Sequence, residues 1–413
     1  MSDSSAPITG LVLTGGGARA AYQVGVLKAI AAIRRESGAA NTGNPFPVIA
    51  GTSAGAINAA ALACHADDFD NAVRCLCEVW ENFHAEQVYR ADSLGVIRTG
   101  ARWLTMMSIG WLIARWHRAR PRSLLDNTPL EALLSRLVST ERLHAMMRGG
   151  HLRGLAVTAS SYGSGLHVTF YDALVDIVPW TRSQRIAVRT AIGVPHLLAS
   201  SAIPFVFPAT ALDIDGHTEY CGDGSMRQAA PISPAVHLGS QRILVVGAGR
   251  MHEPPGVRAG SGEYPSLAQI AGHALSNIFL DALAVDVERL QRINSTLALL
   301  TPEARAATSL KPIEVLVIAP SQRLDDIAAK HLNQLPLPVR TMLRGVGVQG
   351  QGDDARGAAL ASYLLFEAPY TRELMALGEA DTRARRADVL RFFGWQAGEA
   401  VPVPPADVAV AAG

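Results

Sequence analysis

The sequence predicts an α/β protein with three layers, α/β/α, around a mostly parallel central sheet. An apolar strand at 8–13 leads through glycines into a helix, and a second strand at 46–50 leads directly into an alanine-rich helix at 56–66. Strands and helices that alternate at this spacing are joined by right-handed crossovers, which place neighbouring strands parallel. The chain has 413 residues, of which 49% are hydrophobic, so its core can be large enough for such a fold.

The order of the remaining segments predicts where helices are inserted into this frame. The first helix carries apolar residues at helical spacing and is expected to stop at Gly38. The stretch 67–150 is expected to be an inserted helical region. Within it, Thr128 is expected to cap a helix, with Pro129 at the first helical position and Glu131 closing a capping box.

Period-two and apolar runs predict the strands of the second half. We expect a hairpin of strands at 155–158 and 166–171, a helix at 188–201, and strands at 210–214, 243–246 and 313–318. The strand at 210–214 is followed by a tight Asp215-Gly216 turn. Long helices are expected after Pro265.

Three parts of the chain are expected from this pattern. Residues 1–250 form the core, which includes the helical insertion at 67–150. Residues 251–396 form a mainly helical C-terminal region packed on that core. The tail 397–413 is rich in Pro, Ala and Val without periodicity, so we expect it to be disordered.

Composition excludes several classes of function. A formal net charge of +1 lacks the positive stripe that nucleic-acid binding requires. The four cysteines show no CxxC pair, so we expect reduced thiols and no structural metal. The longest apolar run, at 103–114, is shorter than the ~20 residues that span a bilayer. No secretory signal is visible at the N-terminus, so a cytoplasmic location is expected.

A glycine-flanked serine follows the second predicted strand. The run Gly51-Thr52-Ser53-Ala54-Gly55 fits the G-x-S-x-G pattern, in which the glycines permit a turn sharp enough to expose the serine hydroxyl. The strand before the motif and the helix after it are the context that this motif requires. The alternative interpretation is that Ser53 only caps the helix.

A glycine loop also lies between a strand and a helix. The exposed N–H groups of Gly15-Gly16-Gly17-Ala18-Arg19 can bind an anion. That anion is either a dinucleotide pyrophosphate or the oxyanion of an acyl-transfer intermediate. A dinucleotide site expects an acidic residue after the second strand, where this chain has the serine motif instead. A plain packing turn is the third alternative, and a Walker loop is excluded because no Gly-Lys-Ser/Thr follows.

A serine nucleophile needs a base. Twelve histidines leave the choice open, and the chain order of α/β-hydrolases can be drawn through Asp223 and either His237 or His273. Asp223 lies between Gly222 and Gly224 and is better presented than any of these histidines. Its alternative interpretation is an ordinary turn aspartate.

Taken in order, the Gly-Gly-Gly-Ala-Arg loop, the Gly-Thr-Ser-Ala-Gly turn and the downstream Asp-Gly-Ser resemble the motifs of patatin-like phospholipases, bacterial members included. The stretches 123–126, 199–204 and 227–234 are also similar to this family. The resemblance covers about residues 8–246 well, and beyond them it is only general.

The resemblance implies a patatin-like fold and a serine acyl hydrolase of the phospholipase A or lysophospholipase type. Its substrates would be fatty-acyl esters of membrane phospholipids, and it would need no cofactor or metal. Ser53 is implied as the nucleophile, and Asp223 as the base that takes its proton directly. The implied oxyanion hole consists of the N–H groups of Gly15, Gly16 and Gly17. The implied supporting residues are Arg19, Gly51, Gly55 and Gly224.

Two positions depart from the family pattern. Ala20 stands where a final glycine is usual, and Ser225 stands where glycine or alanine is usual. These departures motivate one alternative, a non-catalytic lipid-binding scaffold of the same fold. A dinucleotide-binding enzyme, motivated only by the glycine loop, is a further alternative. Arg19 is expected either to fix the loop or a phosphate, or to be a solvated residue of the first helical turn.

The segment 98–122 predicts transient contact with a membrane surface. It combines Trp103, Trp111 and Trp116 with a short apolar run and several arginines, and no acidic residue lies between Asp92 and Asp126. Aromatic and arginine side chains of this kind suit the lipid headgroup region. The alternative is a helix packed over the core, with its arginines reaching to water.

Overall fold

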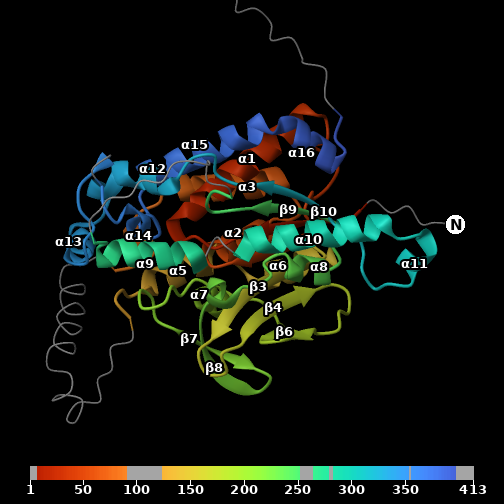
Figure 1. Cartoon of the computed structure of the whole chain (residues 1–413), viewed down its shortest axis with the longest axis horizontal. Helices are drawn as coiled ribbons and strands as arrows, with labels where there is room; N and C mark the ends of the chain where they lie inside the picture. Colours follow the sequence, from red (N-terminus) through yellow and green to blue (C-terminus); the bar gives the residue numbers. More distant parts are fainter. Residues whose placement is uncertain (1–6, 91–122, 252–263, 279–281, 353–354, 397–413) are drawn as a thin grey trace, which may run out of the picture.

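The computed structural model describes residues 7–90, 123–251, 264–278, 282–352 and 355–396 (Figure 1). The predicted tail at 397–413 lies outside the described residues. So do Trp103, Trp111 and Trp116, the predicted membrane contacts.

The middle layer is a mostly parallel sheet, as predicted. Its strands in the described residues are β1 (Thr9–Leu13), β2 (Val48–Thr52), β3 (Gly154–Ser161), β4 (His167–Ala173), β5 (Thr181–Arg182), β6 (Arg185–Arg189), β7 (Thr210–Ile214), β8 (His217–Asp223), β9 (Arg242–Val246) and β10 (Glu314–Ile318). Strands β10, β9, β1, β2 and β3 lie side by side in this order, all in parallel pairs. The sheet continues through β4, antiparallel to β3, to β6 and β5, while β8 pairs with β3 and β7.

Helices cover this sheet and connect its strands. In the first half they are α1 (Ala21–Glu36), α2 (Ala54–Ala63), α3 (Phe69–Glu81), α5 (Thr128–Leu137), α6 (Thr140–Arg148), α7 (Val194–Ser200) and α8 (Ser233–His237). In the second half they are α9 (Leu267–Ser276), α10 (Ala282–Leu299), α11 (Pro302–Ala306), α12 (Leu324–His331), α13 (Leu337–Gly345), α14 (Ala358–Ser362), α15 (Ala368–Ala384) and α16 (Arg386–Phe393). Two short 3-10 turns matter for the site, η1 (Gly17–Ala20) and η3 (Gly224–Arg227).

The two faces of the sheet explain the three layers. Successive residues of a strand point to opposite faces. Leu11 and Leu13 of β1 accordingly join the core cluster that includes α1, α2 and α15. Val12 joins the opposite cluster, with residues of α8 and α10. Figure 1 shows α1, α15 and α16 together on one side of the sheet.

The second half of the chain shares both the sheet and its covering layer with the first half. Strand β10 extends the sheet beside β9 in parallel register. Helix α15 packs along α1, and buried residues of both helices belong to one hydrophobic cluster. Strand β10 and helix α15 therefore contribute to the same core as the N-terminal strand–helix units.

One predicted helix is wrong in its first half. The helix expected at 188–201 begins only at Val194, because Arg185–Arg189 forms strand β6 beside β4. Ile186 and Val188 pack on one face of this strand and Ala187 on the other, which is a strand pattern. Pro195 then stands in the first turn of α7, where its ring is tolerated.

The predicted Thr128 cap is also wrong. Helix α5 begins at Thr128 itself, with Asn127 before it and no side-chain cap. The carboxylate of Asp126 accepts hydrogen bonds from both the Thr128 hydroxyl (2.5 Å) and the Thr128 N–H (2.9 Å). The Thr128 N–H is thus taken by Asp126, and the Glu131 N–H donates to the Asn127 carbonyl oxygen at 3.4 Å, so the expected capping box between Thr128 and Glu131 does not form.

Other predictions at this level are confirmed. Strand β7 has the expected bounds, and Asp215 and Gly216 form a turn with φ angles of +52° and +81°. Strands β3 and β4 form the expected antiparallel hairpin. Gly38, at φ +73°, follows the end of α1.

Candidate active site

Ser53 occupies a sharp turn between β2 and α2. Its backbone has φ +56° and ψ −132°, a strained conformation for a residue with a side chain. A Cβ on Gly55 would lie 2.4 Å from the Leu13 carbonyl oxygen, and one on Gly51 would lie 2.5 Å from the Gly55 carbonyl oxygen. Both flanking positions of the motif therefore require glycine. The Ser53 N–H donates to Ser200 Oγ at 2.8 Å, which helps to hold the turn.

The Asp223 carboxylate lies directly beside the Ser53 hydroxyl. Ser53 Oγ donates to Asp223 Oδ2 at 2.6 Å, and the Ser225 N–H donates to Asp223 Oδ1 at 2.9 Å. Asp223 stands at the end of β8, which pairs with β3, and its side chain is fully buried. A Cβ on the next residue, Gly224, would lie 2.3 Å from the Thr158 carbonyl oxygen, so this turn also requires glycine.

Burial makes this carboxylate a stronger base than a free aspartate. Loss of hydration raises the pKa of Asp223 to about 6, against the opposing hydrogen bonds from Ser53 and Ser225. The nearby Ser225 hydroxyl also lowers the pKa of Asp223 slightly, although its Oγ makes no complete hydrogen bond with a described residue. At neutral pH the carboxylate is ionised and still poised to accept a proton.

The histidines considered from the sequence lie apart from this pair. His237 stacks on Trp180 with ring centroids 4.2 Å apart, and burial lowers its pKa to about 4. His217 begins β8 and His273 lies in α9. Within the described part of the chain, no hydrogen bond joins any of the three to Ser53 or Asp223. The geometry is therefore that of a serine–aspartate pair.

The glycine loop lies between β1 and η1, beside the serine turn. Gly17 has φ +56°, and a Cβ on it would lie 2.3 Å from the Tyr363 carbonyl oxygen. The Ala18 N–H donates to that same oxygen at 3.1 Å, so Tyr363, from the second half of the chain, holds the loop. Among the described residues, none accepts a hydrogen bond from the N–H of Gly15 or Gly16. These donors are available to an incoming oxyanion.

Arg19 is not the solvated residue that one interpretation of the sequence expected. Its side chain is buried and ion-pairs with Asp325. Its Nε donates to Ser362 Oγ at 2.8 Å, and its guanidinium lies 4.0 Å from the centroid of the Tyr363 ring. These contacts tie the glycine loop to the C-terminal region, which supports the interpretation that Arg19 fixes the loop.

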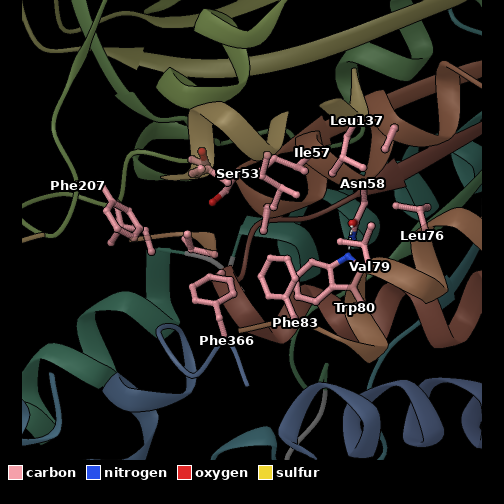
Figure 2. Close-up of a pocket in the computed structure, with 18 residues that line it drawn as sticks. Ser53, Ile57, Asn58, Leu76, Val79, Trp80, Phe83, Leu137, Phe207 and Phe366 are labelled. Atoms are coloured by element: carbon pink, nitrogen blue, oxygen red, sulfur yellow. Dashed lines mark hydrogen bonds between the residues drawn. The ribbon is translucent and has the colours of Figure 1, made fainter. Parts of the chain in front are cut away.

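Ser53 lines an apolar cavity (Figure 2). The cavity is narrow, with about 40 Å³ open to the centre of a water-sized sphere. Ser53, Ile57 and Ala61 line it from successive turns of α2, so the cavity follows that helix for about 12 Å at 1.5 Å per residue. Its other walls are mostly aromatic and aliphatic: Leu76, Val79, Trp80, Phe83, Val88, Leu130, Leu133, Leu137, Ile203, Phe207 and Phe366.

Several residues of the site were not predicted from the sequence. Ser200 supports the serine turn, and the Ala202 carbonyl accepts from the Asp223 N–H at 3.0 Å. Both belong to the stretch 199–204, whose similarity to the family was the available signal. Tyr363 and Phe366, by contrast, carried no sequence signal, because they reach the site only through the fold.

Comparisons with solved structures list distant similarities. Human GIVD cytosolic phospholipase A2 is 10% identical, with a TM-score of 0.44, and the match covers 94% of this chain. The chain spans 60% of the length of that structure. VipD from Legionella pneumophila is 12% identical with a TM-score of 0.28, over 90% of this chain and 67% of that one. Among the described residues, no helix is long and apolar enough to cross a membrane.

The comparison with protein-family models gives the assignment. A search among curated proteins found no match. The family model for patatin-like phospholipases, however, matches residues 11–236, more than half of the chain. The matched segment contains the glycine loop, the serine turn and the aspartate described above. This chain belongs to the patatin-like phospholipase family.

Proposed function

We propose that this protein is a serine hydrolase that cleaves fatty-acyl esters of phospholipids or lysophospholipids. Family membership supports a lipid acyl hydrolase in general. The observation that carries the finer proposal is the 2.6 Å hydrogen bond from Ser53 Oγ to Asp223 Oδ2, beside an apolar cavity that Ser53 lines. Such a cavity accepts an acyl chain and leaves the ester carbonyl at the serine.

The proposed reaction uses only these side chains and water. Ser53 Oγ attacks the ester carbonyl carbon while its proton passes to Asp223. The carbonyl oxygen becomes an oxyanion beside the N–H groups of the Gly15–Gly17 loop, and it reverts to a carbonyl as the alcohol leaves with the proton from Asp223. Water, deprotonated by the same carboxylate, then attacks the acyl-enzyme carbonyl. The bond to Ser53 Oγ breaks, the fatty acid is released, and Asp223 returns the proton to Ser53 Oγ.

The two departures from the family pattern fit a working enzyme. Ala20 is fully buried, so its methyl group packs in the interior rather than in the path of a substrate. Ser225 keeps its N–H on Asp223 Oδ1, so the turn that presents the carboxylate is intact. The scaffold alternative therefore gains no support from these positions. Contact with a membrane surface, which the substrate requires, remains part of the proposal.

The direct test is hydrolysis of mixed phospholipid vesicles by the purified protein, with released fatty acids and lysophospholipids identified by mass spectrometry. We expect product from the wild type and none above background from Ser53→Ala. A fluorophosphonate probe should label the wild type only, because it reacts with an activated serine. A correctly folded wild type that neither binds the probe nor releases fatty acid would refute the hydrolase proposal in favour of a scaffold.

The cavity predicts a preference for long acyl chains that one substitution should remove. Ala61 lines the cavity two turns along α2 from Ser53, so Ala61→Leu should fill its distal end. We expect kcat/KM for a long-chain ester to fall about tenfold or more, because each methylene kept out of an apolar site forfeits about 0.8 kcal/mol. A short-chain ester, measured on the same variant, is the control and should be hydrolysed at the wild-type rate. An equal loss on both esters would show that the acyl chain lies elsewhere.

A further inference from the structure

A chain of buried side-chain amides links the glycine loop to the helix that carries the serine. Asn58 lies on α2, five residues after Ser53, and is fully buried. Its Nδ2 donates to the Ala20 carbonyl oxygen at 3.2 Å and to Gln23 Oε1 at 3.0 Å. Gln23 of α1, also fully buried, donates from Nε2 to the Thr14 carbonyl oxygen at 2.7 Å.

These bonds reach both ends of the loop. Thr14 is the residue before Gly15, and Ala20 is the last residue of η1. The two carbonyls are thus held from one point on the nucleophile helix, directly by Asn58 and through Gln23. Asn58 Oδ1 accepts from Trp80 Nε1 at 2.9 Å, so the same amide is locked to the wall of the cavity (Figure 2).

Packing makes this arrangement sensitive to displacement. The Thr14 carbonyl already lies so close to α2 that a Cβ on Gly55 would be 2.5 Å from it. The loop therefore rests on the start of α2, with Tyr363 holding it from the other side through the Ala18 N–H. Oxyanion stabilisation requires donors placed within a few tenths of an ångström, and a 1 Å error in such positions can cost about 10²-fold in rate.

We propose that Asn58 and Gln23 are positioning residues, which set the distance between the loop N–H groups and Ser53 Oγ. The inference rests on the proposed hydrolase function. Asn58 lines the cavity, but the polar atoms of both side chains are engaged with Thr14, Ala20 and Trp80, so neither is free to hydrogen-bond the substrate. Their effect is on the transition state, in which the oxyanion forms, and little on binding of the uncharged ester.

The test compares two substitutions of the same kind at different places. Asn58→Leu removes the bonds to the loop, and Gln23→Met removes the Thr14 arm with a smaller disturbance. Asn294→Leu is the control, because Asn294 also holds a distant segment through its side-chain amide, with two hydrogen bonds to the N–H and carbonyl of Ile313, away from the site. Thermal unfolding, kcat and KM on a short soluble ester, and the rate of fluorophosphonate labelling are measured for each.

We expect kcat and the labelling rate to fall about tenfold to a hundredfold in Asn58→Leu and to a lesser extent in Gln23→Met, with KM within about twofold of the wild type. Asn294→Leu should lower the melting temperature without changing kcat. The positioning role is wrong if Asn58→Leu and Gln23→Met both fold and both have the same kcat as Asn294→Leu. An inactive wild type would instead refute the hydrolase proposal, so the two failures are distinguishable.

Discussion

Ser53→Ala and Asp223→Asn are each expected to reduce ester hydrolysis by about 10³-fold or more, and the double variant is expected to be little worse than either single one. The reason is the direct 2.6 Å hydrogen bond between the two side chains. If the two side chains act as one unit, loss of either one stops the same step. The residual activity of each variant then comes only from the oxyanion donors and from substrate binding. Initial rates on a soluble ester, for the four proteins side by side, measure this non-additivity.

Histidine variants provide the control for this experiment. His217→Gln, His237→Gln and His273→Gln should each retain most of the activity, because none of the three is hydrogen-bonded to Ser53 or Asp223 among the described contacts. A folded histidine variant that loses several orders of magnitude in turnover would show that the proton passes through an imidazole. The pair would then have to be reinterpreted as part of a triad.

Hydrolysis should lose activity in mildly acidic solution, with an inflection near pH 6. Burial raises the pKa of Asp223 to about 6, and only the ionised carboxylate can take the serine proton. Between pH 8 and pH 4, kcat/KM on a soluble ester should therefore fall about 100-fold, at about tenfold per pH unit below the inflection. Circular dichroism at each pH separates this loss from acid unfolding. An inflection near pH 4 would mean that the carboxylate is not desolvated in the free enzyme.

The raised pKa of Asp223 also makes the stability of the protein depend on pH. An ion-paired carboxylate, whose pKa is lowered, would give the opposite dependence. The folded protein binds a proton at Asp223 more tightly than the unfolded chain, whose aspartate pKa is near 3.8. The stabilisation that the folded state gains from this tighter proton binding is therefore fully present below about pH 4 and is lost as pH rises through 6. Asp223→Asn removes the buried charge. The change in the free energy of unfolding that it causes should be more favourable at pH 8 than at pH 4 by up to about 3 kcal/mol. Urea unfolding of both proteins at the two pH values tests this; a pH-independent difference would contradict it.

Local sequence was sufficient for the strand–helix units and for the serine turn. Gly51 of the serine turn is required by its contact with Gly55, four residues on, whereas Gly55 is required by its contact with the Leu13 carbonyl of the neighbouring strand. Apolar runs likewise identified β1 and β2, because strands buried on both faces have little polar alternation. The side chain of Asp223 was found by its glycine-rich turn and by family resemblance, although nothing local brings it to Ser53.

What surrounds the pair was decided only by the tertiary structure. The segment 185–189 forms strand β6 because β4 offers it an edge, and its run of five residues is too short for periodicity alone to separate it from the helix that follows. Tyr363, Ser362 and Asp325 reach the glycine loop from more than 300 residues away, through the Tyr363 carbonyl and through contacts with the buried Arg19 side chain. Sequence patterns predict the backbone conformation that a residue requires and whether it is buried. They do not predict which distant segment meets these requirements, and this is why the serine and its motif were predictable while the walls of its site were not.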